Sequence, residues 1–231
     1  MIEQIRKNLD EKGYHYWTID EFLENTEEFY EIVKQVHNYH LPLAVKTNNL
    51  FYTCCIHGLE GNQYPNEISV DEIPARRKLI ADNNYKVDQQ WYWFGGSFVS
   101  RFKEMIQDFA ISLYPDLTKE NIEHEARMTM YANGDFTAIH QDSAAPGRKC
   151  AILIYLSDEK NYNDGGGKLI LTDHETKNFV EDVLPVFPNY AIIDIENHSL
   201  YHAVEEVKNN FQRIAFLDFI WNSEVKKIFG R

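Results

Sequence analysis

Two residues one position apart, His140 and Asp142 in the segment AIHQDSAAPGRK, are the first side chains that could do chemistry together. On an extended segment they leave the same face, because successive side chains of a strand alternate between its two faces. Such a pair can bind a metal ion, but so short a pattern occurs by chance in many proteins. Its meaning depends on what else the chain offers.

Three further residues favour a metal site. Tyr131 precedes the pair, His202 lies in the later segment LYHAVEEV, and Arg213 opens the apolar segment RIAFLDFIW. Two imidazoles and one carboxylate bind one face of an octahedral Fe(II) ion and leave positions open for a bidentate 2-oxo acid and O2. Arg213 would hold the distal carboxylate of that acid with its planar fork, and Tyr131 would add a hydroxyl donor. His198 is a competing ligand, but a histidine that opens a strand fits better, which favours His202.

The elements upstream of this set are predicted to be helical and to support it. Apolar residues recur at helical spacing in residues 1–13, 18–42 and 95–115. The second of these helices begins with a capping box formed by Thr18 and Glu21.

Downstream of residue 119 the pattern changes to segments of strand length, separated by turn residues. Short strands in series are typical of a β-sandwich or barrel. We therefore expect an α+β protein with a single domain, residues 1–231. Residues 1–119 would form helical support and a lid region, and residues 120–222 the β core.

Over about residues 127–221 the chain resembles the Fe(II)/2-oxoglutarate-dependent oxygenases, specifically their prolyl-4-hydroxylase-like branch. The segments that carry the resemblance are YANGDFTAIHQD, AILIYLS with DGGGKLIL, VLPVFPNYAIIDI, and HAVEEV with RIAFLDFIW. The resemblance implies a double-stranded β-helix (jelly-roll) core with supporting N-terminal helices. It also implies iron at His140, Asp142 and His202, 2-oxoglutarate held by Arg213 with Tyr131, O2 as co-substrate, and ascorbate as an activator.

The chain departs from the family pattern at two positions that do not touch the iron. Many members carry a lysine in place of Arg213, and an acidic residue often follows the paired glycines, where this chain has Lys168. Position 142 matters more for the reaction. Halogenating relatives have Gly or Ala there, which opens a position for chloride, so Asp142 favours hydroxylation.

Composition limits the partners and the compartment. A formal net charge of -13 would repel nucleic acids and anionic membrane surfaces, so we expect neither as a partner. The three cysteines have no zinc-like spacing, and the first residues have no apolar core typical of a signal peptide. No apolar run is long enough to cross a bilayer. These features predict a soluble cytoplasmic protein with reduced thiols.

Candidate substrate residues come from strand alternation and from the connection before the core. Glu125 and Arg127 share the face of Tyr131, where they either grip a zwitterion or form an ion pair with each other. Trp221 shares the face of Arg213 and either lines the pocket mouth or packs in the core. Two more places complete the set, a basic pair that could belong to a lid and a serine after the metal pair: Arg76, Arg77 and Ser143.

The expected function is hydroxylation of an unactivated C–H bond, most simply in a small free amino acid. The length of the chain, its ligand spacing and the arginines before its core look similar to bacterial enzymes that hydroxylate or halogenate free lysine and related amino acids. The alternative within the same class is a peptidyl, prolyl-type hydroxylase that acts on a protein. From another class, the chain could be a metal-binding interaction module without turnover.

Overall fold

The computed structural model describes residues 1–21, 27, 30–31, 52–57, 89–94, 97–142, 144–173, 176, 178–198 and 200–228. For residues 52–57, 89–94 and 97–98 it describes the backbone alone. No helix within these ranges is long and apolar enough to span a bilayer.

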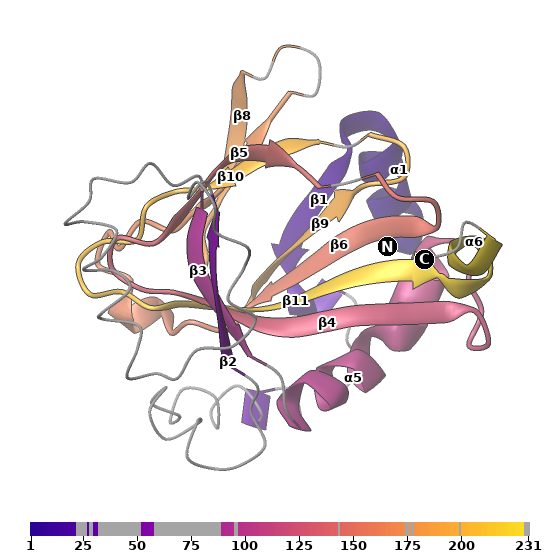
Figure 1. Ribbon diagram of the computed structural model, residues 1–231, viewed down its shortest axis with the longest axis horizontal. Coiled ribbons are helices and arrows are strands. Elements are labelled where there is room, and N and C mark those ends of the chain that lie inside the picture. Colours follow the sequence, from indigo (N-terminus) through magenta and orange to yellow (C-terminus); the bar gives the residue numbers. More distant parts are fainter. Residues whose placement is uncertain are drawn as a thin grey trace.

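Within the described ranges, one antiparallel sheet of eleven strands forms the body of the protein (Figure 1). Its order is β1-β9-β6-β11-β4-β3-β5-β10-β7-β8, with β2 paired to β3. The strands are β1 (Tyr14–Thr18), β2 (Tyr52–His57), β3 (Gln89–Phe94), β4 (Ile122–Tyr131), β5 (Phe136–Gln141), β6 (Arg148–Tyr155), β7 (Leu169–Thr172), β8 (Phe179–Val183), β9 (Asn189–Asp194), β10 (Tyr201–Val204) and β11 (Arg213–Asn222). Short helices η1 (Ile19–Glu21), η3 (Glu159–Asn161) and α6 (Ser223–Ile228) lie between and after them.

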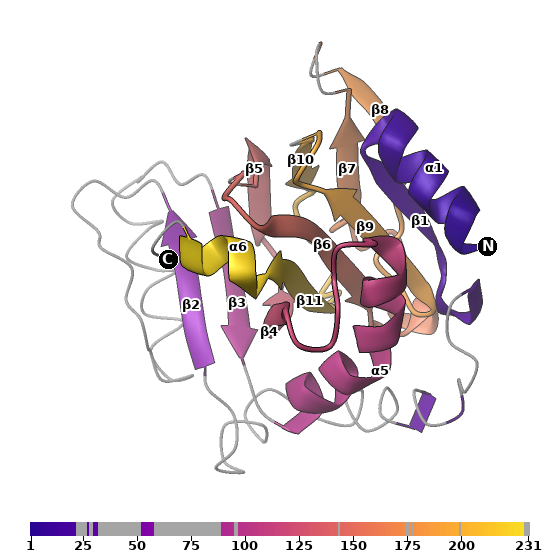
Figure 2. The same ribbon diagram turned by 90° about the vertical axis from the view of Figure 1, so that its right-hand side faces the viewer.

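Of the elements that the structure describes, two helices cover the outer face of the sheet (Figure 2). They are α1 (Ile2–Lys12) and α5 (Ser97–Leu113). The apolar stripe of α5, which includes Phe102 and Ile106, packs in one cluster with outward residues of β4, β6, β9 and β11. Gly13 ends α1 in the left-handed conformation at φ 79°, as its position after the helical pattern predicts.

The inner face of the same sheet encloses a second apolar cluster, which joins β6, β9 and β11 to β7 and β8. Alternation along β11 separates the two clusters. Ala215, Phe219 and Trp221 point inward, whereas Phe216 and Ile220 belong to the outer cluster. A sheet that curls so that its inner faces pack together, with helices on the outside, confirms the predicted α+β fold with a jelly-roll core.

The first half of the chain differs from its predicted helical character. Strands β1, β2 and β3 all lie before residue 119 and belong to the sheet. Glu21 forms no observed capping box with Thr18, which ends β1. Its carboxylate instead accepts hydrogen bonds from the Tyr190 hydroxyl at 2.7 Å and from His15 Nε2 at 2.9 Å. Most of the helix predicted over residues 18–42 lies outside the described residues.

Candidate metal centre and co-substrate pocket

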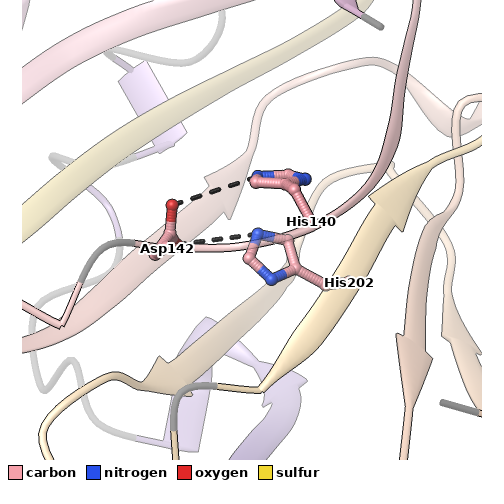
Figure 3. Close-up of side chains that lie close together, drawn as sticks. All are labelled: His140, Asp142 and His202. Atoms are coloured by element: carbon pink, nitrogen blue, oxygen red, sulfur yellow. Dashed lines mark ion pairs between the residues drawn. The ribbon is translucent and has the colours of Figure 1, made fainter.

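His140, Asp142 and His202 lie together at one end of two neighbouring strands (Figure 3). His140 is near the end of β5, Asp142 follows that strand, and His202 in β10 lies directly opposite His140 in the antiparallel register. Asp142 Oδ1 is 4.0 Å from His140 Nε2, and Asp142 Oδ2 is 3.6 Å from His202 Nε2. The spacing of one residue predicted for the first pair and the pairing of β5 with β10 together make a three-residue cluster.

Backbone carbonyls set the orientation of both imidazoles. His140 Nδ1 lies 2.9 Å from the Ala138 carbonyl oxygen, and His202 Nδ1 lies 3.1 Å from that of Leu200. A carbonyl only accepts hydrogen bonds, so each Nδ1 must carry the proton and donate it. This leaves the Nε2 atom of each ring on the side of Asp142.

The donor set fits a divalent metal of the iron type. One ligand atom from each of the three residues lies within 4.8 Å of the others, and this is the one such group of histidine, cysteine or acidic side chains among the described residues. Two imidazoles and one carboxylate, grouped at one side of a cavity, match the facial set that binds non-haem Fe(II). The Nδ1 hydrogen bonds supply the outer support that ligating histidines usually have.

The competing histidine is held elsewhere. His198 is half-buried, its Nε2 is hydrogen-bonded to the Asp10 carbonyl oxygen at 2.9 Å, and its side chain lies against Gly13. It therefore packs on the end of α1 and not beside Asp142. The choice of His202 over His198 agrees with this geometry.

Arg213 is a buried cation whose guanidinium is only partly satisfied. Its side chain is 1% exposed, and its Nε donates to the Gly167 carbonyl oxygen at 2.8 Å. Its Nη2 is buried without a hydrogen-bond partner. An unsatisfied buried charge is costly, so such a group points to an anionic ligand that completes it. A carboxylate suits the planar fork of a guanidinium.

Two tyrosines stand beside that guanidinium. Its carbon is 4.8 Å from the ring centre of Tyr131 and 5.1 Å from that of Tyr155. Tyr131 is the register partner of Arg213, and its hydroxyl is 3.0 Å from Thr137 Oγ1. The hydroxyl of Tyr155 is buried without a hydrogen-bond partner. Burial raises the pKa of Tyr155, and the neighbouring Arg213 offsets part of that rise, so the hydroxyl is kept as a neutral donor.

Tyr155 was missed by sequence reasoning, although a signal was available. The segment AILIYLS is almost entirely apolar, so the sequence alone does not indicate which of its side chains point inward. In β6, however, Tyr155 falls on the same inward face as Ala151 and Leu153. The tyrosine hydroxyl at the end of this otherwise apolar strand could have indicated a residue of the site.

A cavity of about 210 Å³ joins these groups. One part of it is lined by Arg213, Tyr131 and the metal cluster, as we name the group of His140, Asp142 and His202. Another part is lined by Arg127 and Phe219. Apolar residues complete the wall, among them Leu153, Ile193 and Leu217. Small molecules bind in this kind of site, an apolar hollow with a few convergent polar groups.

The remaining candidate substrate residues lie in different places, and only one of them lines the cavity among those that the structure describes. Arg127 lines the cavity, and its Nη2 donates to Glu125 Oε1 at 2.8 Å, so the two form the ion pair that was one of their predicted alternatives. Trp221 is 5% exposed and packs beside Arg148 in the inner cluster, not against the cavity. Three other candidates lie outside the described residues: Arg76, Arg77 and Ser143.

Comparison with known proteins agrees with this geometry. Residues 126–219 match the family described as the 2OG-Fe(II) oxygenase superfamily. That segment contains all three residues of the metal cluster, Arg213 and Tyr131. No curated protein sequence matches the chain.

Solved structures share the fold at low sequence identity. A Pseudomonas putida prolyl-4-hydroxylase is 12% identical with a TM-score of 0.61, over 96% of this chain and all of that one. A Trichoplax adhaerens prolyl hydroxylase, solved with a peptide fragment of the hypoxia inducible factor oxygen degradation domain, is 16% identical with a TM-score of 0.61, over 100% of this chain and 93% of that one. IDO from Bacillus thuringiensis is 12% identical with a TM-score of 0.55, over 96% and 98%.

Proposed function

We propose that the chain is a 2OG-Fe(II) oxygenase that hydroxylates an unactivated C–H bond of a small free amino acid; the match of residues 126–219 to that family supports the reaction class. The family is one of oxidoreductases that use Fe(II), 2-oxoglutarate and O2. The observation that carries the proposal is the grouping of two imidazoles and one carboxylate in the same cavity as a buried, incompletely bonded arginine.

In this proposal each polar group of the cavity has one task. His140, Asp142 and His202 hold the iron, and Arg213 with Tyr131 holds the distal carboxylate of 2-oxoglutarate. When bound, Fe(II) supplies the redox chemistry with which O2 oxidises both 2-oxoglutarate, to succinate and CO2, and a C–H bond of the substrate.

The protein itself orients the metal ligands, supplies the charge of Arg213 and excludes water from the cavity. The Ala138 and Leu200 carbonyls accept hydrogen bonds from the two Nδ1 atoms, so each ring is turned with its Nε2 towards the metal position. The Gly167 carbonyl aims Arg213 into the cavity through its Nε. The apolar wall keeps water from the reacting carbon, which suppresses side reactions of an activated oxidant.

Asp142 also bears on the type of reaction. Its carboxylate stands where halogenating relatives leave room for chloride, and its two oxygens lie 4.0 Å from His140 Nε2 and 3.6 Å from His202 Nε2. This arrangement supports hydroxylation over halogenation.

Two observations bear on the substrate. The cavity of about 210 Å³ is small, below the volumes of roughly 300 Å³ and more that are usual for ligand pockets, which supports a small molecule. The Trichoplax adhaerens relative binds a peptide fragment, which keeps a peptidyl hydroxylase as the second candidate.

Cys150 is buried as a free thiol, which supports action in the reducing cytoplasm.

Succinate formation tests this proposal. The protein is incubated with Fe(II), ascorbate and 2-oxoglutarate, alone and with panels of free amino acids and of peptides, and product mass is measured beside succinate. We expect stimulation by free amino acids with a gain of one oxygen atom. Turnover with peptides alone would transfer the proposal to the peptidyl candidate. Absence of succinate together with absence of iron binding would leave a non-catalytic interaction module.

A further inference from the structure

A second arginine lines the cavity far from the one assigned to 2-oxoglutarate. Arg127 in β4 is the register partner of Leu217 in β11, whereas Arg213 is the partner of Tyr131. The four residues from Arg127 to Tyr131 span about 13 Å of strand. The carbon chain of 2-oxoglutarate is much shorter than this, so a molecule held at Arg213 leaves Arg127 to another ligand.

The guanidinium of Arg127 is held in place by a small cluster, which we name the rim cluster: Glu125, Arg127, Arg148 and Phe219. Glu125 accepts from Arg127 at 2.8 Å and from Arg148 at 3.3 Å. The ring centre of Phe219 is 5.4 Å from the guanidinium carbon of Arg127 and 4.1 Å from that of Arg148. Stacking and ion pairing together preorganise a planar fork at the cavity wall.

The charges of the rim cluster favour an anion. Two guanidinium groups share the single carboxylate of Glu125, so the cluster as a whole is positive. Glu125 does not line the cavity, and among the described lining residues the only carboxylate is Asp142, which belongs to the metal cluster. Among the described residues of this part of the wall, a cationic side chain would meet no carboxylate, whereas an anionic one would meet Arg127.

We propose that Arg127 is the specificity-determining residue that binds a carboxylate of the substrate, which is therefore a small carboxylic acid. The inference rests on the proposed function for the reaction itself. Glu125 and Phe219 act as positioning residues that orient the guanidinium. The apolar wall formed by Leu153, Ile193 and Leu217 would then contact the hydrocarbon part of the acid between the two arginines.

Matched acids and amides test the assignment through binding, independently of turnover. The enzyme is loaded with Fe(II) and 2-oxoglutarate without oxygen and titrated calorimetrically with leucine, proline and lysine, and with the carboxamide of each. A capped Ala-Pro-Ala tripeptide, acetylated and amidated, represents the peptide alternative. The variants are Arg127→Gln, which removes the charge, and Arg127→Lys, which keeps the charge but loses the fork. Arg101→Gln is the control, because Arg101 is an exposed residue of α5 that pairs with Glu104.

At least one acid is expected to bind the wild type roughly tenfold or more tightly than its amide, as a charge-assisted hydrogen-bond pair predicts. Arg127→Gln should abolish this preference, Arg127→Lys should weaken it, and Arg101→Gln should retain it. Circular dichroism shows whether each variant is folded. If Arg127→Gln does not fold, the acid-to-amide preference of Arg127→Lys tests the assignment.

Four results would overturn the assignment: no acid binds, acids and amides bind alike, the preference survives in a folded Arg127→Gln or is unweakened in Arg127→Lys, or the capped tripeptide binds best. Succinate assays on the same proteins separate this failure from failure of the proposed function. A wild type that binds acids through Arg127 but forms no succinate would keep the subsite and refute the oxygenase reaction.

Discussion

Replacement of Arg213 by methionine should remove the thermal stabilisation that 2-oxoglutarate gives to the protein. Arg213 is 1% exposed, and its Nη2 is buried without a hydrogen-bond partner. Methionine has a similar length and no charge. The substitution removes a costly buried cation but also leaves the Gly167 carbonyl oxygen without its donor. These effects oppose each other, so the ligand-free melting temperature should change by no more than about 4 °C, equivalent to about 1 kcal/mol.

The ligand-dependent part can be estimated from linkage. At a 2-oxoglutarate concentration one hundred times Kd, binding stabilises the wild type by about 2.7 kcal/mol, a rise in Tm of about 5–11 °C for a chain of this size. Loss of the charged partner of a buried carboxylate costs about 3–5 kcal/mol, which weakens binding more than about a hundredfold. At the same concentration the variant should then gain no more than about 0.4 kcal/mol, or roughly 1–2 °C.

Differential scanning calorimetry without oxygen measures both quantities, with Fe(II) present and with or without 2-oxoglutarate. Arg101→Met is the matched control, since the side chain of Arg101 is 47% exposed on α5. It should keep the full shift. An Arg213→Met protein that is folded and still gains most of the wild-type shift would refute the role given to this arginine.

Three further predictions concern the backbone that aims Arg213, the metal ligands and a tyrosine at the sheet edge. Gly167 has φ +71°, and an added Cβ would lie 3.2 Å from the Cδ of Arg213, so Gly167→Ala should raise KM for 2-oxoglutarate in steady-state assays. Gly134→Ala is the control, because Gly134 has φ +87° and lies in open space; it should lower only the free energy of unfolding in urea, by about 1 kcal/mol. A KM for 2-oxoglutarate that is the same in Gly167→Ala as in Gly134→Ala would contradict this account. Asp142→Ala and His140→Ala should each abolish substrate-coupled succinate formation, and full coupling in either variant would exclude that residue as a ligand. Burial, with a hydrogen-bonded carboxylate, raises the pKa of Tyr16 from 10.0 to about 12, so its contribution to stability is complete below pH 10 and is lost towards pH 12. Over that range the free energy of unfolding in urea should fall more steeply for the wild type than for Tyr16→Phe, and parallel curves would count against the shift.

The metal cluster could be predicted from the sequence because its geometry follows from local rules. Strand alternation places His140 and Asp142 on one face, and the apolar segment after His202 indicates a strand. The face of β11 that carries Arg213 follows from the same alternation. What the spacing alone could not supply was the register that sets His202 opposite His140.

Elements that depend on distant partners were harder to predict. β1 is a short strand that pairs with β9, far along the sequence, and with no other strand of the described part of the chain. Glu21 looked like part of a capping box because its bonds to His15 and Tyr190 depend on tertiary packing. Alternation placed Arg127 and Glu125 on one face, but the choice between a zwitterion site and an ion pair depends on side-chain rotamers, which a pattern of residue types does not contain.

The central claim is that His140, Asp142 and His202 hold one iron, and equilibrium Fe(II) binding without oxygen tests it most directly. His202→Ala is compared with His198→Ala, in which a neighbouring histidine bonded to Asp10 is removed. The wild type and His198→Ala should each bind one Fe(II) per chain, and His202→Ala should lose tight binding. Retention of iron by a folded His202→Ala protein, or its loss in His198→Ala, would contradict the account.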